Sequence, residues 1–418
     1  MPIAHPSTVL IWIISLVSIL CMLLRPRRIP EVYWVCGGGL LLVLTRLVAL
    51  RQATHAVYEG LDIYLFLTGM MILAELAREE GVFDWAADVA AQHARKSPGR
   101  LFILIYLVGT LVTALLSNDA TAVVLTPAVL AVVRRAQVDP KPYLLACAFI
   151  ANAASFVFPI SNPANLVIFE QHMPALGTWL RIFLLPSSAS ILVTFLCLRR
   201  VSRKQLQGEM RGGVKQVFLS TEGKLALAGL ALAAAALLSS SALGFSLGAP
   251  TCCAAVFAIA IVAWRDRSAP RKVAKGVSWS VLPLVAGLFV IVEALQNAGL
   301  LRLGLMGLQG LADTAPWVAK GSAAVVVALL SNGMNNLPIG LISGAAIQHS
   351  QGASVVAHAI LIGVDLGPNL SVTGSLATIL WLIALRRENV EITAREFFKI
   401  GVIAMPLALI ASLLVLWN

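Results

Sequence analysis

Two polar stretches, SNDATAVVLTP at residues 117–127 and SNGMNNLPIG at residues 331–340, interrupt long apolar segments of the chain. Each begins with a polar triplet and reaches a proline, Pro127 or Pro338, a few residues later. Polar, broken backbone inside a bilayer is costly unless it lines a cavity or is buried in protein. The two stretches therefore predict a binding site in the interior of a membrane protein.

A second polar pair follows the first, at residues 152–165 and 365–378, and the spacing between partners is nearly constant. Ser117 and Ser331 are 214 positions apart, whereas Asn152 and Asp365 are 213 apart, as are Asn162 and Ser375. Further upstream, residues 67–81 align with 285–299 at a spacing of 218 positions. This spacing indicates a duplicated unit, which is typical of carriers that bind their substrate at the repeat interface.

The composition excludes most soluble functions. With 59% apolar and 12% charged residues, and a mean hydropathy of +0.88, the chain is predicted to be an all-α polytopic membrane protein and not a globular enzyme. Neither the six cysteines nor the six histidines show metal-ligand spacing, so no metal site and no cofactor are expected. The net charge of +11 is interpreted as membrane orientation and not as binding of nucleic acid.

Ten membrane spans are expected, five in each repeat, and an odd number per repeat inverts the second copy. The first repeat is 1–200, a basic cytoplasmic linker is 201–223, and the second repeat is 224–418. The apolar runs lie near 8–24, 33–50, 60–77, 143–170, 178–198, 224–243, 249–264, 280–297, 354–385 and 397–416, with 143–170 and 354–385 broken. The first run is predicted to be an uncleaved helix because it has no basic residue before it.

Each repeat also holds a candidate re-entrant hairpin, 101–133 in the first and 317–348 in the second, preceded by a short helical stretch at 82–96 or 300–312. The hairpin arms are about 18–24 Å long at 1.5 Å per residue, less than the roughly 30 Å of a bilayer core. Two ordinary short spans joined by an exposed turn remain the alternative.

The basic residues predict the orientation of the chain. With ten spans, 26 of the 31 Lys and Arg residues fall on the side of the first loop, and 5 fall on the other side. Basic loops are cytoplasmic, so both termini are expected outside a bacterial-type plasma (inner) membrane.

Five acidic residues lie away from the loops, and two of them belong to polar breaks. Asp119 and Asp365 are the predicted proton-coupling residues, because a carboxyl group at such depth can accept and release a proton. Glu293 is a less favoured candidate. Glu75 precedes Arg78 by three residues, which is compatible with a simple helix-surface ion pair.

The amide and hydroxyl side chains of the breaks are the candidate substrate ligands: Ser117, Asn118, Asn162, Asn165, Ser331, Asn332, Asn335, Asn336, Thr373 and Ser375. These side chains and the free N–H groups of half-helices suit a small, neutral solute rich in hydroxyl groups. No Lys or Arg accompanies them. A purely structural role, in which the amides cap the broken helix ends, is the alternative and is compatible with binding.

At these residues the chain resembles the arsenite and antimonite permease family, ArsB, within the larger ion transporter superfamily. The resemblance is carried by SNDATAVVLTP (117–127), PISNPANLVI (159–168), SNGMNNLPIG (331–340) and VDLGPNLSVTGSLATILWL (364–382). It implies broken helices and re-entrant hairpins that meet at the site. It also implies arsenic resistance through an antiporter that exports arsenite and antimonite in exchange for protons, with optional association with a soluble ArsA-type ATPase.

Two departures from that family qualify the resemblance. Val364 stands where members can have Cys, so binding is not expected to need an arsenic–sulfur bond. The hairpin motif Ser-Asn-Thr of sodium-coupled relatives is Ser117-Asn118-Asp119 here, which favours protons over sodium. The alternatives are a sodium- or proton-coupled carrier of another small solute, such as silicate or a carboxylate, and, less favoured, a channel or a membrane-embedded transferase.

Overall fold

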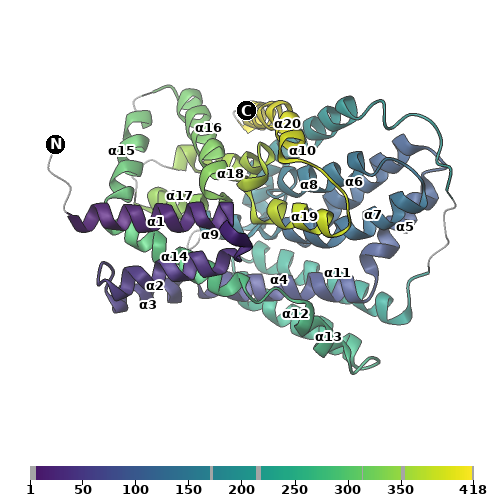
Figure 1. The fold of residues 1–418 in the computed structure, drawn as a ribbon, viewed down its shortest axis with the longest axis horizontal. Helices are drawn as coiled ribbons and strands as arrows, with labels where there is room; N and C mark the ends of the chain where they lie inside the picture. The colour runs from purple at the N-terminus through teal and green to yellow at the C-terminus, as the bar shows by residue number, and fades with distance from the viewer. Residues whose placement is uncertain (1–5, 170–172, 213–217, 313, 350–353, 417–418) are drawn as a thin grey trace.

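The computed structural model describes residues 6–169, 173–212, 218–312, 314–349 and 354–416, and these form α-helices with no β-strand among them (Figure 1). In chain order the helices of the first half are α1 (Pro6–Leu24), α2 (Glu31–Leu44), α3 (Leu50–Glu59), α4 (Leu61–Glu79), α5 (Val82–His93), α6 (Pro98–Leu115), α7 (Thr126–Arg135), α8 (Lys141–Ala153), α9 (Pro163–Phe169) and α10 (Leu176–Val201). Those of the second half are α11 (Thr221–Ala242), α12 (Gly248–Ala263), α13 (Ala269–Gly276), α14 (Val281–Asn297), α15 (Leu300–Ala312), α16 (Pro316–Met334), α17 (Asn336–Gln348), α18 (Ser354–Leu366), α19 (Leu376–Arg387) and α20 (Ala394–Leu416).

Six helices in the described ranges are long and apolar enough to cross a membrane: α1, α6, α10, α11, α16 and α20. The number rises to eight if α3 with α4, bent by 48°, and α13 with α14, bent by 40°, each form one span. Helices α2 and α12 are apolar but shorter. The ten-span count therefore stays a prediction, while the multi-pass, all-helical character agrees with it.

The first arms of both hairpins are longer than predicted. Helix α6 has 18 residues and α16 has 19, which corresponds to about 27–28 Å at 1.5 Å per residue. The second arms are shorter, because α17 has 13 residues and the α7 arm begins only after a break. The first arms therefore approach the roughly 30 Å of a bilayer core, whereas the second arms are well short of it.

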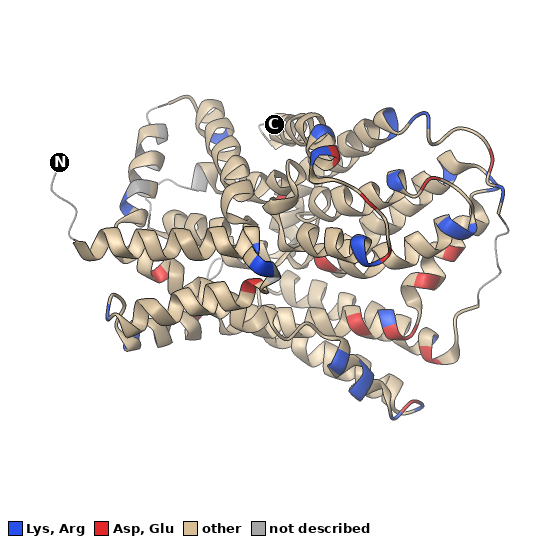
Figure 2. Ribbon diagram, viewed as in Figure 1, with Lys and Arg blue, Asp and Glu red and all other residues tan. Residues whose placement is uncertain are grey.

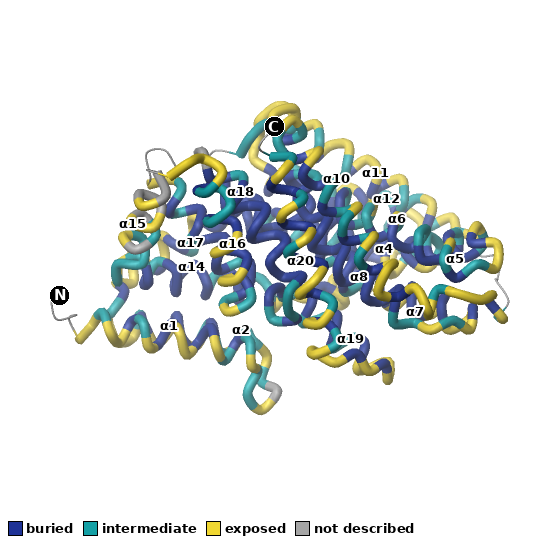
Figure 3. Tube along the Cα trace, turned by 90° about the horizontal axis from the view of Figure 1, so that it is seen from above, coloured by how far each residue is buried: buried dark blue, intermediate teal, exposed yellow. Residues whose placement is uncertain are grey.

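Helices from the two halves of the sequence pack closely against each other. The main pairs join α10 to α20, α4 to α12, α2 to α14 and α9 to α17, and each pair contains one helix from each half. Figure 3 shows the buried centre formed where these helices meet, with α1 exposed along much of its outer side. Lys and Arg gather toward the end of the molecule that holds α5, α7 and α13, and few lie at the opposite end (Figure 2).

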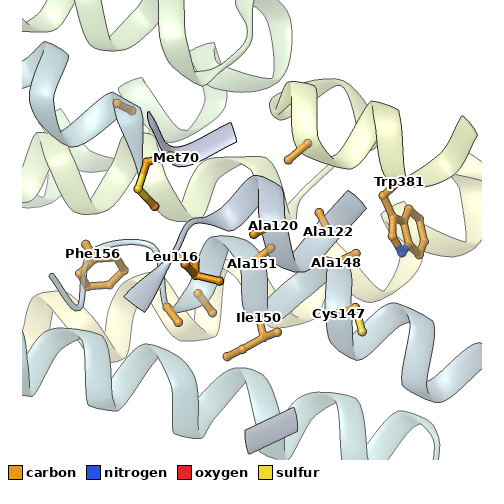
Figure 4. Packing of buried hydrophobic residues seen from close by; sticks show 14 of the residues in the cluster. Met70, Leu116, Ala120, Ala122, Cys147, Ala148, Ile150, Ala151, Phe156 and Trp381 are labelled. Carbon is orange, nitrogen blue, oxygen red and sulfur yellow. The ribbon is translucent and has the colours of Figure 1, made fainter. Parts of the chain in front are cut away.

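Small residues allow the first hairpin to approach the broken helix α8. Ala120 and Ala122 lie against Ala148 and Ala151 of α8, and all four are at most 1% exposed (Figure 4). Gly109 on α6 faces Ile150 so closely that a Cβ atom there would lie 2.9 Å from it. Side chains this small let the backbones of membrane helices pack directly.

Gly363 of α18 provides a test of this close packing. A Cβ atom at Gly363 would lie 2.4 Å from the carbonyl oxygen of Ala324 on α16, so Gly363→Ala is expected to destabilise the fold by about 1–3 kcal/mol. The matched control is Gly333→Ala on α16, where nothing lies within 4 Å and alanine favours the helix by up to about 1 kcal/mol. Thermal unfolding in detergent measures both. An equal midpoint for the two variants would contradict the packing argument.

Candidate functional site

The first break begins where α6 ends. Leu116 leaves the helical region, with φ −113° and ψ −86°, and Ser117 Oγ then accepts a hydrogen bond of 3.1 Å from Ala120 N. A π-helix follows at Ala120–Leu125, directly before Thr126 and Pro127. Proline cannot donate to the preceding turn and its ring clashes with it, and the wider π-turn relieves that clash. Asn118, which is buried, and Asp119, which is half-buried, lie just before this π-helix.

The second break differs in place from the predicted one. Ser331-Asn332-Gly333 is helical, because Ser331 Oγ donates to Val327 O at 2.8 Å and Asn332 Nδ2 to Ala328 O at 2.8 Å, one turn back on α16. The chain breaks at Asn335, whose φ of 75° and ψ of 154° are unusual for a residue with a side chain. Its Oδ1 accepts a hydrogen bond of 3.4 Å from Leu337 N, which caps α17. The hairpin break is therefore displaced from Ser331-Asn332-Gly333 to Asn335.

The two broken helices are the predicted ones, 143–170 and 354–385. Helix α8 ends at Ala153 and α9 starts at Pro163, while α18 ends at Leu366 and α19 starts at Leu376. Asn162 (φ −149°, ψ 132°) and Ser375 (φ −139°, ψ 144°) are extended residues just before the second helices. These two positions were expected to correspond, and they have the same conformation.

Buried hydrogen bonds join the two broken helices. Asn162 Nδ2 donates to Asp365 Oδ1 at 2.7 Å, and Asn152 Nδ2 donates to Asn369 Oδ1 at 3.0 Å. All four side chains are at most 2% exposed. Asn152 and Asp365, the positions predicted to be equivalent, thus each bond to a residue from the other half of the chain. Within the described residues Asp365 Oδ2 has no hydrogen-bond partner.

A cavity of about 50 Å³ lies where the hairpins and the broken helices meet. Its polar lining consists of six of the predicted residues: Asn118, Asp119, Asn162, Asn335, Asn336 and Ser375. Asp119 is half-buried and is the only ionisable side chain in the described lining. We call this cavity the polar pocket. It presents amide, hydroxyl and carboxylate groups and no cation.

Apolar residues close the polar pocket, and sequence reasoning missed them. Most come from α1, α4, α14 and α19, among them Met22, Leu67, Val285, Leu288 and Ile379, and α9 and α17 add one residue each. A signal for two of them existed, because Leu67 and Val285 begin the aligned stretches 67–81 and 285–299. Leu288 lies in the same aligned stretch, whereas Met22 of α1 and Ile379 of α19 gain their position from helix packing.

A larger cavity of about 250 Å³ adjoins the polar pocket and shares Asp119, Leu67 and Leu376 with it. Ser117 lines this second cavity, which we call the vestibule, and Glu75 and Arg78 lie in its wall on α4. Arg78 Nε donates to Glu75 Oε2 at 2.9 Å, which confirms the ion pair considered from the sequence. Asp119 therefore stands at the boundary between the vestibule and the polar pocket.

The remaining predicted residues do not line the polar pocket. Asn165 Nδ2 donates to Ser155 O at 2.9 Å, and Asn332 Nδ2 donates to Gly367 O at 3.0 Å, so both hold the breaks together. Thr373 Oγ1 donates to Asn332 O at 2.8 Å. Glu293 is half-buried on α14 and accepts a bond of 3.4 Å from Asn297 Nδ2. The observed contacts of Asn165, Asn332 and Thr373 therefore agree with a structural role in the breaks, the alternative to substrate binding.

The sequence has relatives among membrane pumps. It is 28% identical over 346 residues to an arsenical pump membrane protein of Escherichia coli, covering 80% of this chain and 81% of that one. It is 25% identical over 421 residues to an uncharacterized transporter of Mycobacterium tuberculosis, covering 95% of each chain.

Solved structures share the fold. The YdaH transporter of Alcanivorax borkumensis superposes with a TM-score of 0.56 at 15% identity, covering 87% of this chain and 86% of that one. The MtrF efflux pump of Neisseria gonorrhoeae gives 0.50 at 13% identity, covering 90% and 84%. The family profile described as "Citrate transporter" matches residues 9–364, which is most of the sequence. The chain therefore belongs to the citrate transporter family, whose profile covers the hairpins, the first broken helix and the α18 half of the second.

Proposed function

We propose that the protein exports arsenite, As(OH)₃, and antimonite, Sb(OH)₃, from the cytoplasm in exchange for protons. The observation that carries the proposal is the lining of the polar pocket, which offers amides, a hydroxyl and one carboxylate but no Lys or Arg in the described residues. An anion such as citrate would need compensating positive charge in a low-dielectric site. The name of the Escherichia coli relatives, arsenical pump membrane protein, supports the same substrate.

The size of the polar pocket supports a small solute. About 50 Å³ corresponds to roughly four water-sized positions. Arsenous acid has four heavy atoms and three hydroxyl groups, which can donate to Asp119 and to the amide oxygens of Asn335 and Asn336. A citrate ion is several times larger than arsenous acid, so the small volume of the polar pocket favours the smaller solute. A carrier of another small neutral hydroxyl compound, such as silicate, is the second candidate on the same grounds.

Proton coupling is assigned to Asp119 and Asp365. Asp365 is buried and its Oδ2 has no hydrogen-bond partner among the described residues, where an ionised carboxylate is costly, so in the proposed cycle this conformation is the one in which Asp365 carries a proton. Asn162 lines the polar pocket and donates a hydrogen bond to Asp365. The protonation state of Asp365 would therefore affect how Asn162 binds the substrate. Asp119, on the vestibule side, alternately binds a proton and a substrate hydroxyl.

The proposal includes a membrane arrangement. The chain would form ten spans in two inverted repeats, with the basic ends of α5, α7 and α13 in the cytoplasm and both termini outside the inner membrane. The vestibule, with Glu75 and Arg78 at one end, would then open the polar pocket to the cytoplasm. A soluble ArsA-type ATPase, where the cell has one, would bind at the same basic face in the cytoplasm.

Transport into everted membrane vesicles from a host without its own arsenite efflux tests the proposal. Vesicles with an acidic interior are expected to accumulate arsenite, to be indifferent to sodium, and to be unaffected by excess citrate in the medium. Dissipating the proton gradient with an uncoupler should return accumulation to the level of vesicles that lack the protein. Sodium-dependent uptake, or uptake of citrate in place of arsenite, would overturn the assignment.

A further inference from the structure

An apolar cavity of about 510 Å³ lies between α15 and the helices α16, α17 and α18, and it shares no lining residue with the polar pocket. Its described lining includes two glycines and several aliphatic side chains, among them Gly304 and Gly307 of α15, Val326 and Leu330 of α16, and Ile339 and Ile342 of α17. Such a lining suits hydrocarbon and offers little to a polar ligand.

The wall of this cavity continues into the outer apolar surface of α16. Val326 and Leu330 line the cavity and are also 53% and 44% exposed. Their neighbours Val325 and Leu329 are exposed as well. In a membrane protein, exposed aliphatic residues on a spanning helix face lipid tails. The cavity is therefore within reach of the bilayer.

Helix α5 is the counterpart of α15 in the first half of the chain, and it packs against its hairpin closely. Helix α5 precedes the α6–α7 hairpin, and its Ala87, Ala90 and Ala91 are buried against that hairpin. Asp88 of α5 also forms an ion pair with Arg135 of α7. Gly307 of α15, by contrast, has no atom within 4 Å of the place where a Cβ would stand. The space beside α15 is thus a local feature and not a consequence of the fold.

The length of the cavity, and the charged residue at one of its ends, indicate what kind of molecule occupies it. From Ser322 to Met334 the lining follows α16 over twelve helical steps, or about 18 Å, somewhat more than half of a roughly 30 Å bilayer core. Trp317, 63% exposed, and Lys320 lie just beyond Ser322, as aromatic and basic residues do at a membrane interface. Lys320 has no ion pair with any acidic residue that the structure describes.

We propose that this cavity binds one acyl chain of an anionic phospholipid, with the lipid phosphate at Lys320. The tail lies along α16 and ends beside Met334, next to the strained Asn335 at the break of the second hairpin. Bound lipid thereby fills the space behind the second hairpin, which carries Asn335 and Asn336 of the polar pocket. This inference is independent of the transported solute.

Native mass spectrometry of the detergent-purified protein, titrated with phosphatidylglycerol or phosphatidylcholine, tests the proposal. Gly307→Leu places an isobutyl group in the cavity and is expected to weaken phosphatidylglycerol binding at least about tenfold, because the lost burial of two or more methylenes is enough for that change. Gly310→Leu is the matched control, since Gly310 lies on the same helix, has open space around it and does not line the cavity. Lys320→Gln is expected to remove the preference for phosphatidylglycerol over phosphatidylcholine.

Each other outcome overturns the proposal. Equal binding of phosphatidylglycerol by wild type and Gly307→Leu would place the lipid elsewhere. If native mass spectrometry finds the wild type as a dimer and Gly307→Leu as a monomer with unchanged lipid binding, then a second copy of the chain covers this face. Binding of detergent alone at all lipid concentrations would mean that the cavity has no lipid specificity. Wild-type elution and thermal stability of Gly307→Leu verify that the variant folds.

Discussion

An Asp365→Asn variant is expected to lose proton-driven arsenite accumulation in everted vesicles by roughly 100-fold while it keeps arsenite–arsenite exchange. The asparagine Oδ1 can still accept the 2.7 Å bond from Asn162 Nδ2, so the link between the broken helices remains. What disappears is the group that takes up and releases a proton. Exchange of one substrate molecule for another needs no proton and should continue.

The control for Asp365→Asn is Asp62→Asn. Asp62 also lies on a predicted spanning helix, α4, and its Oδ1 accepts a hydrogen bond of 3.0 Å from Gly248 N, but it does not line the polar pocket. This variant should accumulate arsenite as the wild type does. Full proton-driven accumulation by Asp365→Asn, at normal protein levels, would remove Asp365 from the coupling mechanism.

Helix positions were the most predictable part of this protein. The stretches 82–96 and 300–312 correspond to α5 at Val82–His93 and α15 at Leu300–Ala312. Long apolar runs with glycine and proline at their ends leave few alternatives, because lipid requires a hydrogen-bonded helix. Helices α3 and α13 were missed. They are short and carry polar residues, and they become helical as bent extensions of α4 and α14.

The site was predictable in composition and less so in geometry. Six predicted polar residues line the polar pocket, because an amide or a carboxylate within an apolar segment needs a partner or a cavity. The sequence does not reveal which of the two a given side chain finds. Asn332 bonds to its own helix and to Gly367, whereas Asn335, three positions later, turns into the pocket. That difference depends on α18 lying against α16, a long-range contact.

An Asp119→Asn variant is expected to fail differently, losing both proton-driven accumulation and most arsenite–arsenite exchange. Asp119 lines the polar pocket and the vestibule together, so its carboxylate contacts the substrate directly in the proposed mechanism. An asparagine there offers one acceptor in place of two, and the KM for arsenite should rise about tenfold or more. The Ser331→Ala control should be near wild type, because Ser331 Oγ bonds only to Val327 O on its own helix.

The pH dependence of exchange separates a direct role of Asp119 from a structural one. If protons and substrate compete for this carboxylate, exchange by the wild-type protein must fall as the medium on the vestibule side is acidified, and added arsenite must restore it. Residual exchange by Asp119→Asn should not change over the same pH range, since an amide does not titrate there. If Asp119→Asn kept the wild-type pH profile at a reduced rate, Asp119 would only support the break in the first hairpin. Competition between proton and substrate would then have to take place at Asp365, which is one hydrogen bond behind the polar pocket.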